Sequence, residues 1–199
     1  MNTGTLSVLL NTRIGSEWIL ESNLDEIKGK VNKALLKLYE KDKYLIKNDL
    51  NERTIAHKFS NYIQEEFNEF DVDCEYNKNV DEVEGNKNIY FLKQEYLELN
   101  KNFKETVSID DIEYVRMSIY PDIIIHKRGS NLQNLLIIEI KKSTNREDRN
   151  FDFSKLKCYT DTSRHNKLGY AWGLFVEFKT KCSTPPMPEL IWYKNGEII

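Results

Sequence analysis

Apolar residues recur every three or four positions in two segments near the N-terminus, at residues 24–44 and 48–67. In the second segment these positions are Ile55, Phe59, Ile63 and Phe67. The spacing places apolar side chains on one face of a helix, so it predicts two amphipathic helices. Asn51 is a suitable N-cap for the second helix, and Glu52 then falls in its first turn.

Short apolar or alternating runs predict strands in the remaining chain. They lie at 71–78, 114–120, 121–127, 135–142 and 170–178, with a further short strand in the tail after residue 184. Gly129 and Asn131 suit a hairpin turn between the strands at 121–127 and 135–142. Helical patterns recur at 91–103 and 150–163, whereas residues 1–20 show no clear pattern.

The predicted order of core elements is helix, strand, strand, strand, helix, strand. This mixture predicts an α/β (α+β) fold, in which a central mixed β-sheet is flanked by helices. We expect one domain over residues 1–199, with an N-terminal helical extension at 1–47 and a core at 48–178. Residues 79–118 form an insertion within the core, and residues 179–199 form a C-terminal strand and tail.

Length and composition are compatible with a single domain that buries a core, since 199 residues are 40% hydrophobic. No run of about 18 apolar residues predicts a membrane span, and the N-terminus has no basic segment typical of a signal peptide. Three cysteines without CxxC spacing indicate reduced thiols. We therefore expect a cytoplasmic protein with no membrane partner.

The net charge of −3 conceals a basic region. Residues 126–170 contain ten Lys and Arg against five Asp and Glu. A local basic face can hold phosphates even when the whole chain is mildly acidic, and Arg149 and Lys157 are expected to contribute. The alternative is that this face is only solvated.

Charged residues stand at the ends of two strands that otherwise have core composition. Asp122 opens the strand at 121–127, directly after Pro121, and Glu139-Ile140-Lys141 closes the strand at 135–142. Side chains alternate along a strand, so Glu139 and Lys141 share a face. In a hairpin, Asp122 lies near this pair, and two carboxylates converge beside one ammonium. A hard divalent cation relieves their repulsion, which indicates metal-assisted phosphodiester hydrolysis.

The E-x-K triplet itself is common in this chain. It occurs at 26–28, 139–141 and 177–179. Only the copy at 139–141 closes a strand whose hairpin partner opens with an acid. Pro121 is also the only proline among the first 184 residues, and proline is tolerated at the first residue of a strand. The combination is therefore rarer than its parts.

Pro121-Asp122 followed by Glu139-Ile140-Lys141 resembles the PD-(D/E)xK nuclease superfamily, which has the restriction-endonuclease-like fold with αβββαβ order. The resemblance covers roughly residues 48–178. It implies that Asp122, Glu139 and the backbone carbonyl of Ile140 bind Mg2+, for which Mn2+ substitutes, and that Lys141 is the catalytic lysine. Family members often carry an acid on the preceding helix, where Glu52 matches, and a basic residue on the following helix, where Lys155 is the candidate.

The resemblance implies a nuclease, with DNA favoured over RNA as the substrate. Defence, restriction or repair are the expected settings, and a homodimer or a larger multi-subunit system fits. The alternative is a catalytically inactive nuclease-like domain that binds nucleic acid or a partner protein. Asp122 as a plain turn acid, Lys141 as a solvated strand end and Glu52 as a helix-dipole acid remain open.

The remaining candidates near the motif are weaker. His57 lies about 140° around the helix from Glu52, so we expect it outside the site. His126 is expected to be peripheral and Lys142 to be structural. Tyr159 fits either the core or the edge of the site, and His165, with Arg164 and Lys167, fits either a phosphate-facing loop or plain surface.

Overall fold

The computed structural model describes residues 24–79, 85–162, 165–166 and 168–199. Expectations for residues 1–23, Arg164 and Lys167 lie outside this part of the chain. The helices are α2 (Leu24–Lys41), α3 (Lys43–Lys47), α4 (Glu52–Glu66), α5 (Lys93–Glu98) and α6 (Arg149–Thr160). The strands are β1 (Asp71–Asp73), β2 (Asn88–Leu92), β3 (Glu105–Ile109), β4 (Ile112–Ser118), β5 (Ile123–His126), β6 (Leu136–Lys142), β7 (Trp172–Phe178), β8 (Glu189–Lys194) and β9 (Glu197–Ile198).

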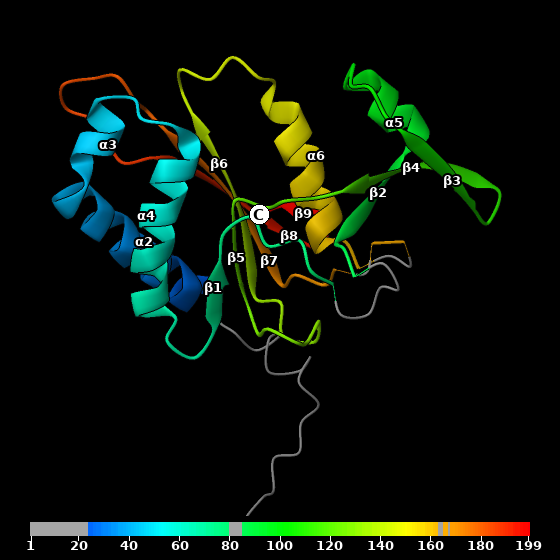
Figure 1. Ribbon diagram of the computed structural model, residues 1–199, viewed down its shortest axis with the longest axis horizontal. Coiled ribbons are helices and arrows are strands. Elements are labelled where there is room, and N and C mark those ends of the chain that lie inside the picture. Colours follow the sequence, from blue (N-terminus) through cyan, green and yellow to red (C-terminus); the bar gives the residue numbers. More distant parts are fainter. Residues whose placement is uncertain (1–23, 80–84, 163–164, 167) are drawn as a thin grey trace, which may run out of the picture.

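A central sheet with strand order β1-β5-β6-β7-β8-β9 organises the molecule. The β6–β7 pair is parallel and the other neighbours are antiparallel. Helices α2, α3 and α4 lie on one side of this sheet and α6 lies on the other (Figure 1). This arrangement confirms the predicted mixed sheet flanked by helices.

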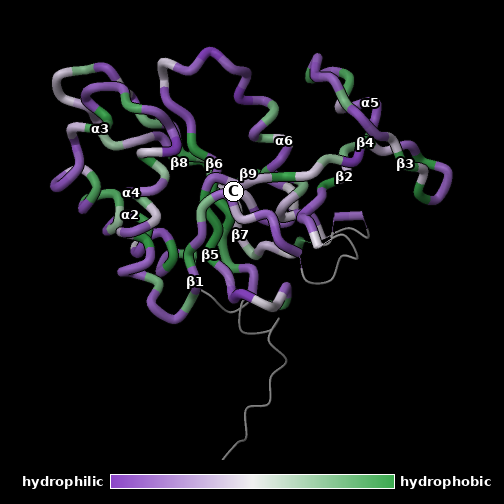
Figure 2. The backbone as a smooth tube through the Cα atoms, viewed as in Figure 1, coloured by the Kyte–Doolittle hydropathy of each residue, from purple (hydrophilic) through white to green (hydrophobic). Residues whose placement is uncertain are grey.

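Two apolar cores cover the two faces of the sheet. Ile138 and Ile140 of β6 pack with α2 and α4, whereas Ile137 packs with Leu156 and Tyr159 of α6. Both faces of β6 are therefore covered, which explains its continuous apolar sequence. The central strands form the most hydrophobic part of the chain trace (Figure 2). Glu139 and Lys141 alternate with Ile140, so both face α6.

The predicted hairpin is present, and its two strands have different lengths. β5 pairs with β6 from Ile125↔Leu136 to Ile123↔Ile138, and Gly129 adopts a φ of 77° in the connection. β6 continues to Lys142, four residues beyond the last pair. The edge of β6 that faces β5 is thus left for other partners over residues 139–142.

Caps and close packing position the two helices that flank this edge. The Asn51 side chain accepts a hydrogen bond from the backbone N–H of Thr54 at 2.7 Å, which confirms the predicted N-cap of α4. Asp148 caps α6 through the N–H of Asn150 at 3.0 Å. A Cβ atom at Gly173 of β7 would lie 3.1 Å from Thr160, so glycine lets α6 approach the sheet closely.

The insertion forms a second, three-stranded sheet in the order β2-β4-β3, with α5 beside it. The strand predicted at 114–120 corresponds to β4. The helix predicted at 91–103 was too long, since α5 covers only Lys93–Glu98. Its first two residues, Phe91 and Leu92, instead belong to β2 and pair with β4. The strand predicted at 71–78 was also too long, since only Asp71–Asp73 finds a strand partner in β5. Within the described residues, no helix combines the length and apolar character that a membrane crossing requires.

Candidate active site

Asp122 occupies the open edge of β6. One of its carboxylate oxygens accepts a hydrogen bond from the backbone N–H of Ile140 at 2.7 Å. The side chain thus takes the place that a further β5 carbonyl would have had. The carbonyl of the preceding residue, Pro121, accepts a hydrogen bond from the backbone N–H of Glu75 at 2.9 Å. This bond fixes the backbone next to Asp122.

Glu139 is buried beneath α6, and only 3% of the residue is exposed. Its Oε2 lies 2.8 Å from Nζ of Lys155, and its Oε1 accepts a hydrogen bond from the hydroxyl of Tyr159 at 2.9 Å. Lys155 and Tyr159 are one helical turn apart, so one face of α6 supplies both contacts. Tyr159 therefore belongs both to the core and to the site.

Burial and a neighbouring carboxylate raise the free-energy cost of ionising both Asp122 and Glu139. Burial, and next the charge of Glu139, raise the pKa of Asp122 to about 8. Burial also raises the pKa of Glu139, against the favourable charge of Lys155. Two neighbouring acids with raised pKa values are common at functional sites, because a cation or a proton must balance them.

Asp152 links the two lysines of the site. Its Oδ2 lies 3.1 Å from Nζ of Lys141, and its Oδ1 lies 2.7 Å from Nζ of Lys155. Lys141 also contacts the exposed Glu147 at 3.3 Å. Glu139, Lys155, Asp152 and Lys141 therefore form a chain of alternating charges on the face of β6 that α6 covers. Asp152 was not predicted as a site residue from the sequence. Its i,i+3 spacing to Lys155 is the signal that indicates an ion pair on one face of the helix.

Glu52 binds the same edge of β6, two residues beyond Ile140. Its Oε1 accepts hydrogen bonds from the backbone N–H of Lys142 and from the side chain of Asn145, each at 2.9 Å. The N–H and C=O of one strand residue point to the same side. The carbonyl of Ile140 therefore lies on this edge, between the N–H bound by Asp122 and the N–H bound by Glu52.

The structure brings together the residues expected at the strand ends. Asp122, Glu139, Ile140, Lys141 and Lys155 are joined by direct contacts or by adjacency on β6, and Glu52 lies on the same strand edge. Lys142 points to the other face, where its Nζ lies 3.0 Å from Oδ1 of Asp49. The structural role expected for Lys142 is consistent with this ion pair.

His57 was expected outside the site, and no direct contact with a residue of the site contradicts this within the described residues. It lines a cavity together with Asp122. Glu52 of the same helix contacts β6 through the Lys142 N–H, whereas Arg53 and His57 line the cavity. His126 instead pairs with Asp73 at 2.9 Å, on the β1 side of the sheet, and His165 packs on Tyr114.

Arg149 has a different environment from the one expected. Its guanidinium donates to the carbonyls of Lys142 and Glu147 at 2.9 and 2.7 Å, and it lies 3.1 Å from a carboxylate oxygen of Glu177. These bonds hold the connection between β6 and α6. Arg149 is therefore a structural residue here, whereas Lys157 is exposed.

The chemistry of the donor set suits a hard divalent cation. In the described part of the chain, no three His, Cys, Asp or Glu side chains converge as a ready-made metal cluster. Mg2+ commonly uses only one or two carboxylates and fills its other positions with water and substrate oxygens. Asp122, Glu139 and the Ile140 carbonyl are such a set, and each carboxylate has lone pairs beyond its present hydrogen bonds.

Comparison with known proteins gives no match to a family model, to a curated protein or to a solved structure.

Proposed function

We propose that the protein is a Mg2+-dependent nuclease with a restriction-endonuclease-like core that hydrolyses phosphodiester bonds, most favourably those of DNA. The order of elements supports this proposal. Helix α4, strands β1, β5 and β6, helix α6 and strand β7 follow one another as αβββαβ, with β2–β4 inserted after β1. β7 then pairs with β6 in parallel.

One observation carries the proposal: Asp122 binds the Ile140 N–H at the strand edge beside buried Glu139. A purely structural cap would not need a buried carboxyl next to it, since Glu139 raises the free-energy cost of ionising Asp122. When bound, Mg2+ would offset this repulsion, polarise a phosphoryl oxygen and activate water. Asp122, Glu139 and the Ile140 carbonyl would hold it.

The lysines have separate roles in this proposal. Asp152 raises the pKa of Lys141 and thereby opposes the effect of burial, so the ammonium is retained. A positive charge beside the reacting phosphate stabilises the negative charge that develops in the transition state. Lys155 contacts Glu139 directly and holds its carboxylate in one orientation. Glu52 fixes the strand edge and is available to the cation directly or through water.

The test is a cleavage panel over single- and double-stranded DNA and RNA, with Mg2+ or EDTA. The wild-type chain should cut in Mg2+ only. Asp122→Asn should abolish cleavage while it keeps an oxygen for the Ile140 N–H, and Lys142→Ala should cut like the wild type. Equal cleavage by the Asp122→Asn protein, or no cleavage of any substrate, would contradict the proposal.

The second candidate is a catalytically inactive domain of the same fold that binds nucleic acid or a protein. The observation that favours it is that both oxygens of Glu139 already accept hydrogen bonds, and that both lysines are already paired. Such a network is also what a relic site would retain for stability. The two candidates differ in Mg2+ binding, which an inactive scaffold does not require.

A further inference from the structure

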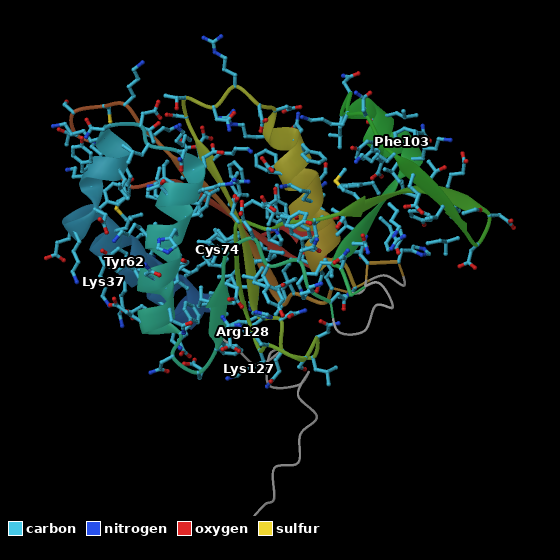
Figure 3. The ribbon with its side chains drawn as sticks, viewed as in Figure 1. Lys37, Tyr62, Cys74, Phe103, Lys127 and Arg128 are labelled. Atoms are coloured by element: carbon cyan, nitrogen blue, oxygen red, sulfur yellow. The ribbon has the colours of Figure 1, made fainter. Side chains whose placement is uncertain are left out.

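A cavity of about 210 Å3 opens beside Asp122, on the α4 side of the proposed active site. It is lined by Arg53, Ala56, His57, Cys74, Glu75 and Asp122. Figure 3 shows Cys74 between α4 and the strands of the central sheet, which marks the position of the cavity. The cavity thus joins the outer surface to the carboxyl that we assign to the cation.

The lysines of the site are poorly placed to hold phosphates other than the one that is cut. The side chains of Lys141 and Lys155 are only 12% and 14% exposed, and Asp152 holds both. A nucleic-acid strand that approaches Asp122 and Glu139 brings several phosphates, of which only one is cut. The neighbouring phosphates need other donors, because the carboxylates repel them.

Arg53 and His57 supply such donors at the cavity. They are four residues apart on α4, so they lie on the same face of the helix, and both are exposed. Arginine offers a planar fork of N–H groups that matches phosphate oxygens, and an imidazole N–H can donate beside it. Both side chains line the same cavity as Asp122.

The present partner of Arg53 is easily displaced. Nε of Arg53 lies 2.8 Å from Glu75, and the two side chains are 82% and 45% exposed. Exposed ion pairs contribute about 0–1 kcal/mol, so loss of the contact between Arg53 and Glu75 costs little. A charge-assisted bidentate bond from Arg to a phosphate is stronger than this pair.

We propose that this cavity is a phosphate-binding subsite, in which Arg53 and His57 hold a phosphodiester group next to the one that is cut. The proposal rests on the proposed nuclease function and names a contact outside the metal and lysine set. In this proposal α4 has two roles: Glu52 contacts the edge of β6, and Arg53 and His57 contact the nucleic-acid substrate.

The test is binding of inorganic phosphate and of a thymidine dinucleotide to the full-length protein without divalent metal. The chain has three histidines, so imidazole NMR signals are few. The His57 signal should shift and saturate with either probe, while those of His126 and His165 stay in place. Arg53→Ala should weaken binding by about tenfold, the usual effect of losing a charged hydrogen-bond partner.

Lys58→Ala is the matched control. It removes one positive charge from the position that follows His57 on α4, and Lys58 does not line the cavity. It should leave binding unchanged. Equal weakening in Lys58→Ala and Arg53→Ala, or equal shifts of all three imidazoles, would mean only general attraction of anions and would overturn the subsite.

Cleavage assays separate this inference from the proposed function. Arg53→Ala and His57→Gln should raise KM for a DNA substrate by several-fold, with little change in kcat. If the wild-type protein binds phosphate at His57 but cuts nothing, the nuclease proposal fails and the phosphate site stands. If it cuts DNA, and both variants cut with wild-type KM, the subsite fails and the nuclease proposal stands.

Discussion

The carboxylate of Asp122 binds the backbone N–H of Ile140 at 2.7 Å and so replaces a strand partner at the end of β5. This hydrogen bond ties a partly buried acid to the strand that carries Glu139. The ionised form of Asp122 is disfavoured, because burial and Glu139 raise its pKa more than Lys155 and Lys141 lower it. The most direct consequence is a dependence of stability on pH.

Without divalent metal, the free energy of unfolding should fall as pH rises. The pKa of Asp122 goes from 3.8 to about 8 in the folded state, so the folded chain binds this proton more tightly than the unfolded chain. The stabilisation is complete at low pH and is lost between about pH 4 and 8, with a slope of at most about 1.4 kcal/mol per pH unit. Urea unfolding at pH 5, 6, 7 and 8 measures this slope. It should be flatter in Asp122→Asn, and an equal slope there would remove Asp122 as its source.

Substitution of Lys141 by alanine should lower the cleavage rate, whereas substitution of Lys142 should lower only stability. Lys141 lies beside the carboxyl pair, so Lys141→Ala should lower kcat strongly with a small change in KM. Lys142 pairs with Asp49 on the other face of β6, so Lys142→Ala should lower stability by about 1 kcal/mol or less and keep the rate. Steady-state kinetics and thermal melts separate the two effects. Similar losses of kcat in both variants would show that strand alternation does not decide the roles.

Asp152→Asn should slow cleavage although Asp152 is expected to touch neither cation nor substrate. Asp152 holds Nζ of Lys141 and Nζ of Lys155, so its loss frees both lysines. We expect kcat to fall by about tenfold to a hundredfold, as for other residues that orient a functional group, with KM nearly unchanged. Glu147→Gln is the control, because Glu147 contacts Lys141 from an exposed position and should matter little. A melting temperature close to wild type must accompany the result, and a rise in KM alone would contradict the positioning role.

Glu52→Gln tests whether the acid of α4 reaches the cation. A glutamine oxygen can still accept the Lys142 N–H, so the strand edge should stay closed. If Glu52 contributes to cation binding, the Mg2+ concentration for half-maximal cleavage should rise, because a neutral amide is a weaker ligand for a hard cation. If Glu52 acts only at the helix terminus, the substitution should cost a few tenths of a kcal/mol in stability and leave the Mg2+ requirement unchanged. Mg2+ titrations of the cleavage rate decide between these results.

The sequence was sufficient for the parts of the site that depend on local pattern. The turn at Gly129 and the two apolar runs predicted the hairpin, and strand alternation placed Glu139 and Lys141 on one face. The Asn51 cap fixed the start of α4 and hence the position of Glu52 in its first turn. Each of these depends on residues close together in the chain.

The parts that were missed depend on long-range contacts. Phe91 and Leu92 were expected to begin a helix, but they end a strand that pairs with β4. The roles of Asp152 and Arg149 follow from how α6 lies on β6, which the sequence pattern does not fix. The position of His57 beside the cavity also depends on which elements surround α4, and a helical wheel does not show these neighbours.

The central claim is that Asp122 and Glu139 bind Mg2+ as a pair, and calorimetric titration of the metal into the protein tests it most directly. At pH 7 the wild-type chain should bind Mg2+ and release protons, because the pKa of Asp122 is about 8 and metal ligands must be deprotonated. Titrations in two buffers with different ionisation enthalpies measure this release. Asp122→Asn and Glu139→Gln should each abolish binding, and Lys142→Ala should bind like the wild type. No Mg2+ binding by the wild-type protein, or unchanged binding by Asp122→Asn, would contradict the claim.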